Sequence, residues 1–301
     1  MAGATRRHGA RLGSKRKRKR KGVEMRPRNF FLSASARHAG SLLHKPSLQA
    51  LIFNAVRLNR PEVTDLLQSD ELGFLAYCIA RRRNSRAQIL QDLWVCYELE
   101  EMRGGYFVEF GSTNGITNSN TWLLEKAFGW RGILAEPNPF WHADLAANRN
   151  AHIEHRCVSS RSGEQVTFLA TDGVDPELSG IAAFANGDHF ADVRHSGTPI
   201  SVETISLNDL LDAYDAPETI DYISIDTEGS ELDILSSFDF GQHRFNLISV
   251  EQNSRTKRAI ETLLMKNGYA RVFPQYSQWD GWYVSKELRS TPPHEIIAPA
   301  L

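Results

Sequence analysis

An apolar segment that runs directly into a glycine-spaced loop is the feature that most constrains the fold of this chain. From Tyr106 to Phe110 every residue except Glu109 is aromatic or β-branched, as in β-strands. Gly111 and Gly115 then let the backbone turn tightly and approach a ligand without an intervening Cβ. This order predicts a binding loop at the end of a strand, followed by a helix over residues 119–128.

A second strand ends in another carboxylate, about twenty residues further along, where doubly wound sheets hold an acid against the ribose hydroxyls of a nucleotide. This strand covers residues 132–135 and leads into Glu136 and Pro137. The two glycines and the two strand-end carboxylates therefore predict one site for a nucleotide-like ligand.

Strand and helix patterns alternate from Gly105 onward, which indicates an α/β fold with a mostly parallel sheet and crossover helices. The expected strands are residues 106–110, 132–135, 153–158, 222–225 and 247–250. An extra hairpin strand is expected at 166–170, a long insertion at 171–199, a strand at 201–205, a helix at 255–267 and a closing antiparallel hairpin at 269–273 and 282–285.

The chain has 301 residues, of which 41% are hydrophobic, enough for one α/β core with an appended helical region. Apolar residues recur at helical spacing before this core, and we expect three or four helices there. The predicted division is a disordered basic tail over 1–44, an N-terminal helical region over 45–103, the α/β domain over 104–288 and a C-terminal tail over 289–301.

An unbroken basic run, Lys15 to Lys21, lies in the first tail. Such a run could bind nucleic acid or an anionic membrane or act as a nuclear address, but a solvated tail is the interpretation that we favour, and we do not expect nucleic acid as a partner.

Three widely spaced cysteines predict neither a disulfide framework nor a zinc site. No apolar stretch approaches the roughly 20 residues of a membrane span, so a cytoplasmic location is expected; the sequence gives no oligomeric state.

Two further strands also end in acids. Residues 220–225 lead into Asp226 and Glu228, before a helix that begins near Ser230, and residues 247–250 lead into Glu251. The carboxyl ends of strands face the ligand crevice in open α/β sheets, so we expect Asp226 and Glu251 to converge with the two acids described above. Glu231 is instead expected to cap its helix.

These blocks resemble the FkbM-type S-adenosylmethionine-dependent methyltransferases. The resemblance covers about residues 104–285 and is carried by segments 108–115, 130–139, 179–181 and 223–235. It implies the class I methyltransferase fold, a Rossmann-like, mostly parallel, seven-stranded sheet with helices on both faces and with its last strand antiparallel.

By the same resemblance the cofactor is S-adenosyl-L-methionine and the acceptor is a hydroxyl of a sugar, polyketide or other small molecule. Asp226 and Glu228 are the implied catalytic residues. The implied cofactor-binding residues are Glu109, Gly111, Ser112, Thr113, Asn114, Gly115, Glu136, Pro137, Cys157, Val158 and Asp226. We expect the acceptor pocket to be built by the insertion at 171–199 and by loops near residues 275–280.

The proton acceptor stays open among Asp226, Glu228, Glu251, His189 and His195, since a carboxylate or a histidine within reach is enough. A divalent metal held by the three acids is an alternative that we do not favour. An NAD-dependent oxidoreductase is opposed by the G-x-x-x-G spacing of the loop. A non-catalytic binding protein on the same scaffold is the remaining alternative.

Overall fold

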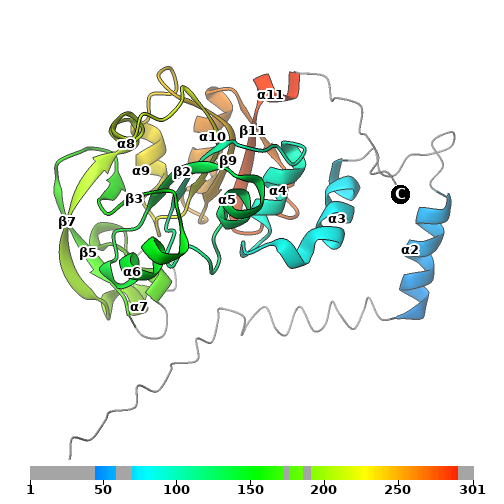
Figure 1. The fold of residues 1–301 in the computed structure, drawn as a ribbon, viewed down its shortest axis with the longest axis horizontal. Helices are drawn as coiled ribbons and strands as arrows, with labels where there is room; N and C mark the ends of the chain where they lie inside the picture. Colours follow the sequence, from blue (N-terminus) through cyan, green and yellow to red (C-terminus); the bar gives the residue numbers. More distant parts are fainter. Residues whose placement is uncertain (1–44, 59–69, 173–175, 186–190, 291–301) are drawn as a thin grey trace, which may run out of the picture.

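The computed structural model describes residues 45–58, 70–172, 176–185 and 191–290 (Figure 1). The basic run at 15–21, His189 and most of the two expected tails lie outside these ranges. Within them the protein is an α/β fold with a mostly parallel sheet, as the sequence predicts. None of the described helices has the length and apolar character needed to cross a membrane.

The helices named in the sequence analysis form with shifts of a few residues at their ends, and further helices form where none was named. The α-helices are α2 (Pro46–Leu58), α3 (Asp70–Arg81), α4 (Gln91–Glu98), α5 (Trp122–Phe128), α6 (Pro139–Asn148), α7 (Ala191–His195), α8 (Leu207–Ala213), α9 (Glu231–Ser237), α10 (Lys257–Lys266) and α11 (Lys286–Ser290). Short 3-10 turns are η2 (Arg82–Asn84), η3 (Pro176–Leu178) and η4 (Ala182–Phe184).

The main sheet has seven strands in the order β10-β11-β9-β8-β1-β2-β3. Its strands are β1 (Tyr106–Phe110), β2 (Arg131–Ala135), β3 (His152–Glu154), β8 (Thr219–Ile225), β9 (Arg244–Glu251), β10 (Tyr269–Val272) and β11 (Asp280–Ser285). β11 pairs antiparallel with both β9 and β10, whereas all other pairs in this sheet are parallel, and β10 and β11 form the expected closing hairpin.

Helices cover both faces of this sheet because alternate side chains of each strand point to opposite sides. On one face Val108 and Ile223 pack with residues of α8, α9 and α10. On the other face Phe107 and Tyr222 pack with residues of α3, α4 and α5. β1 is buried along its whole length, which explains why its sequence is a nearly continuous apolar run.

The prediction of a single strand over residues 153–158 is wrong. The chain forms β3 up to Glu154, leaves the main sheet, and then forms β4 (Cys157–Ser159) in a separate four-stranded sheet of order β4-β7-β5-β6. The side chain of Arg156 folds back onto Glu154, with Nη2 donating to Oε2 at 2.7 Å. A polar contact between residues two apart thus marks the break that apolar spacing does not reveal.

The four-stranded sheet also contains β5 (Gln165–Ala170), β6 (Gly180–Ile181) and β7 (Thr198–Ser206). β5 pairs antiparallel with β6, which lies within the expected insertion, and with β7, which ends it, and not with the strand before it. Figure 1 shows β5 and β7 at the end of the molecule opposite α3.

Candidate functional site

A cavity of about 310 Å³ lies at the carboxyl ends of β1, β2 and β8, and the first residues of β4 also line it. Parallel strands present their carboxyl ends at one edge of a sheet, which is where open α/β folds bind ligands. Most of the sequence-predicted residues meet there. Those lining the cavity are Glu109, Gly111, Thr113, Asn114, Glu136, Pro137, Cys157, Val158, Asp226 and Glu228.

Gly111 brings two of these segments together. Its φ is +71°, and a Cβ at this position would lie 2.4 Å from the carbonyl oxygen of Asp226. That contact is too short for any side chain, so only glycine lets the loop after β1 approach the end of β8 this closely.

Gly115 and Ser112 do not line the cavity. Gly115 has a φ of +75°, and a Cβ there would lie 2.5 Å from Cγ of Arg149. The Ser112 side chain is buried. The structure therefore places both residues in the packing behind the loop.

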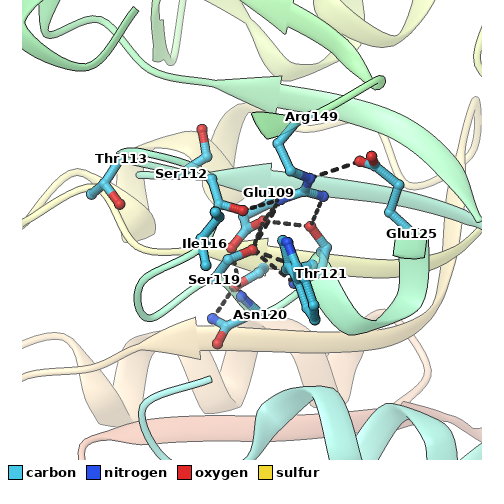
Figure 2. A network of polar contacts seen from close by, with 12 residues as sticks. Glu109, Ser112, Thr113, Ile116, Ser119, Asn120, Thr121, Glu125 and Arg149 are labelled. Carbon is cyan, nitrogen blue, oxygen red and sulfur yellow. Dashed lines mark hydrogen bonds and ion pairs between the residues drawn. The ribbon is translucent and has the colours of Figure 1, made fainter. Parts of the chain in front are cut away.

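Glu109 is the centre of the polar network in Figure 2. Its carboxylate accepts hydrogen bonds from Ser119 Oγ at 3.0 Å, from the Asn120 backbone N–H at 2.7 Å and from the Thr121 hydroxyl. Both carboxylate oxygens are engaged by the segment that leads into α5. Glu109 thus holds the glycine loop to the start of the next helix.

Arg149, the residue directly after α6, closes this network (Figure 2). Its guanidinium is fully buried, pairs with Glu125 at 2.7 Å and lies 3.6 Å from Glu109. It also donates to the carbonyl oxygen of Gly115 at 3.1 Å. A buried arginine that bonds two acids and a backbone carbonyl fixes the loop on the side away from the ligand space.

Glu136 presents its carboxylate at the end of β2. Oε2 accepts from the Thr113 backbone N–H at 2.8 Å, and Oε1 accepts from the Asn138 N–H at 2.9 Å. Burial raises the pKa of Glu136 to about 7, although both backbone N–H groups favour the charged form. Since each carboxylate oxygen has more than one lone pair, Glu136 can still accept hydrogen bonds from a ligand.

Apolar residues line the neighbouring part of the cavity. Cys157 and Val158 reach it from β4, and Trp141 and Phe168 also line it. Burial raises the pKa of the Cys157 thiol to about 12, so this cysteine is a neutral, apolar side chain at ordinary pH. This part of the cavity suits a flat, uncharged ring.

Asp226, Glu228 and Glu251 bring carboxylate oxygens within 4.8 Å of one another, a spacing that could hold a metal ion. Glu228 adopts a left-handed φ of +58°, and its Oε2 lies 2.6 Å from Nη2 of the buried Arg194. Burial, then the charges of Asp226 and Glu228, raise the pKa of Glu251 well above its ordinary value. Asp226 and Glu251 thus converge as expected, but Glu251 does not line the cavity that Glu109 and Glu136 line, and Glu228 is neutralised by an arginine.

The remaining expectations concern Glu231 and the histidines. Glu231 Oε1 accepts from the backbone N–H groups of Thr227 and Gly229, at 3.1 and 2.8 Å. It therefore holds the turn before α9, close to the capping role expected. His195 is exposed at the end of α7 and does not line the cavity.

Other residues of the site were not singled out in the sequence. Gln88, Gln91, Asn120, Trp279 and Asp280 line the cavity, and Arg149 and Arg194 stand behind it. The loop near 275–280 and the insertion, through Glu177 and Ser179, do reach the cavity as expected. The two arginines carry no sequence signal, because their acidic partners are distant in the chain.

The model of the Methyltransferase FkbM domain family matches residues 109–271. No curated protein matches the chain.

Three solved structures are similar at low identity. A precorrin-6y C5,15-methyltransferase from Geobacter metallireducens is 11% identical, with 64% of this chain and 85% of that chain covered and a TM-score of 0.33. A putative RNA methyltransferase from Pyrococcus horikoshii is 9% identical, with 70% and 96% covered and a TM-score of 0.33. A human methyltransferase 10 domain containing protein is 11% identical, with 74% and 99% covered and a TM-score of 0.34.

Proposed function

Because the chain belongs to the FkbM methyltransferase family, we propose that it is an S-adenosylmethionine-dependent enzyme that methylates a hydroxyl of a sugar, polyketide or other small acceptor. The observation that carries this proposal is the Glu136 carboxylate, which ends β2 inside the cavity beside the Gly111 loop. The strand order of the main sheet, with β11 alone antiparallel, supports assignment to the class I methyltransferases.

The residues of the cavity fit this cofactor. Glu136 can accept both ribose hydroxyls, since a carboxylate accepts two charge-assisted hydrogen bonds at once. Cys157 and Val158 offer an apolar surface for the adenine ring, and Gly111 leaves the backbone open to the methionine part. Glu109 supports this loop through its bonds to the start of α5.

When bound, S-adenosylmethionine supplies a methyl group on a positively charged sulfur. That methyl group would go to the acceptor hydroxyl oxygen, S-adenosylhomocysteine would leave, and the hydroxyl proton would pass to a base. We assign Asp226 to that proton or to orientation of the acceptor, and Glu228 to the acceptor side, because both line the cavity at the end of β8.

Methyl transfer by the Asp226→Asn and Glu228→Gln variants tests these roles. Asp226→Asn keeps size and shape but removes the charge, so we expect kcat to fall by about a hundred-fold or more, with little change in cofactor affinity. Glu228→Gln should mainly raise the acceptor KM. The measurement is transfer of labelled methyl groups from S-adenosylmethionine to an accepted substrate.

Full turnover by both variants would show that the two acids after β8 are not catalytic residues. Activity that requires added magnesium, is lost with a chelator and weakens in either variant would instead make these acids metal ligands. Cofactor binding without transfer to any acceptor would favour a binding protein on a methyltransferase scaffold.

A further inference from the structure

The cavity extends along the sheet edge beyond the residues assigned to the cofactor. The cofactor residues belong to the ends of β2, β1, β4 and β8, whereas Asp280 lies at the start of β11 and also lines the cavity. β11 is four places from β2 in the strand order, which corresponds to roughly 19 Å at the usual strand spacing. The β11 side is therefore left for the acceptor.

Segments outside the family match build this side. Gln88 and Gln91 precede residue 109, and Trp279 and Asp280 follow residue 271. Gln91 Nε2 donates to Asp280 Oδ2 at 3.0 Å, which joins the start of α4 to the start of β11. Residues outside the range matched by the family model thus meet at one end of the cavity.

A buried side chain beside β1 and β8 indicates what binds in the cavity. Asn120 is 9% exposed and lines the cavity, and its Oδ1 has no hydrogen-bond partner. Its Nδ2 donates a hydrogen bond to Ser224 Oγ at 2.8 Å, and this bond fixes the orientation of the amide. A buried acceptor atom without a partner is costly unless a ligand donates to it.

The charges of the cavity disfavour an anionic acceptor. Its described lining contains six carboxyl side chains and no lysine, arginine or histidine. The carboxyl residues are Glu109, Glu136, Glu177, Asp226, Glu228 and Asp280. Arg149 and Arg194 pair with Glu109 and Glu228 from behind and do not line the cavity. A phosphate or carboxylate on the acceptor would meet like charges and find no cation.

We propose, on the basis of the function proposed above, that Gln91, Asn120, Trp279 and Asp280 form an acceptor subsite for an uncharged, polyhydroxylated sugar ring. Carboxylate and amide oxygens from separate elements match several hydroxyl donors better than a single ammonium group. The half-buried indole of Trp279 adds an apolar face on which the C–H face of a ring can pack.

Labelled S-adenosylmethionine and three acceptor pools test the subsite with the full chain. The pools are neutral methyl glycosides, sugar phosphates with uronic acids, and amino sugars. We expect transfer mainly to the neutral pool. Asp280→Asn and Trp279→Leu should each raise the KM of the accepted glycoside about ten-fold, as expected for loss of one strong contact, with the Kd of S-adenosylhomocysteine unchanged. Asp233→Asn, an exposed acid on α9, is the matched control and should change neither constant.

Preferred transfer to the charged pool or to the amino-sugar pool would overturn the proposal. It would also be overturned if the protein bound S-adenosylhomocysteine but transferred methyl groups to none of the three pools. Weakened cofactor binding in Asp280→Asn would show that Asp280 contributes to the cofactor site and not to the acceptor subsite. Saturation-transfer NMR with the same pools needs no turnover. Binding of neutral glycosides without binding of S-adenosylhomocysteine would preserve the sugar subsite and reject the methyltransferase cofactor; binding of neither would reject both.

Discussion

Glu136 combines deep burial with hydrogen bonds from two backbone N–H groups, and its protonation should control cofactor affinity. Its pKa is raised to about 7, so the carboxyl is largely protonated at pH 6 and ionised at pH 8. The ribose hydroxyls need an acceptor, which the ionised form provides. We therefore expect the affinity for S-adenosylhomocysteine, measured by calorimetry, to rise about ten-fold between about pH 6 and pH 8.

Glu136→Gln is the control for this prediction, since it keeps the shape and cannot ionise. Its affinity should be weaker at pH 8 and flat over the same range. The raised pKa also means that ionisation of Glu136 costs stability, so the ligand-free wild type should lose free energy of unfolding between about pH 4.5 and pH 7. A wild-type affinity that does not depend on pH would contradict this role of Glu136.

At the residue scale, the sequence predicts that the strand-end acids lie at the site, but it does not predict the arginines that pair with the acids there. Glu136 and Asp226 each follow an apolar strand, and topology brings strand ends together whatever the details of packing. Arg149 and Arg194 acquire their roles only when α6 and α7 fold against the sheet. Asn120 likewise becomes significant through its burial, which no spacing rule gives.

The loop after β1 gives a prediction at the element scale, with a matched pair of glycines. Gly111 and Gly129 have nearly the same φ, +71° and +69°. A Cβ at Gly111 would meet the Asp226 carbonyl oxygen at 2.4 Å, whereas a Cβ at Gly129 would meet nothing within 4 Å. Alanine at either position should cost about 1 to 2 kcal/mol for the left-handed backbone.

Only Gly111→Ala should also displace the end of β8, and we expect it to lower S-adenosylhomocysteine affinity or turnover about ten-fold. Gly129→Ala should leave both unchanged. Chemical denaturation and calorimetry on the two variants measure these effects. Equal loss of binding in both variants would show that backbone strain alone, and not the contact with Asp226, governs the loop.

Periodicity predicts elements well where a strand is buried on both faces, as for β1 and most of β8. It fails at residues 153–158, where Ile153 and Val158 belong to two strands of different sheets. The pairing of β5 with β7 across the insertion was missed for a related reason. Local sequence gives strand propensity, whereas strand partners depend on contacts between distant segments.

For the whole molecule, the cavity should be independent of the basic tail. The described residues that line it extend from Gln88 to Asp280, far from the run at 15–21. Deleting residues 1–24 should leave the melting temperature and the affinity for S-adenosylhomocysteine unchanged, because a solvated charge run makes no packed contacts. A lower melting temperature in the truncated protein would show that the basic segment docks on the acidic body.

Calorimetric titration of the full chain with S-adenosylhomocysteine and, separately, with NAD is the most direct test of the assigned cofactor. We expect one molecule of S-adenosylhomocysteine per chain, a higher melting temperature in its presence, and no heat with NAD. Glu136→Ala should weaken the binding by about 1.5 to 3 kcal/mol, the range for hydrogen bonds to a charged group. Tight binding of NAD with no response to S-adenosylhomocysteine, or an unchanged affinity in Glu136→Ala, would contradict the assignment of the cavity.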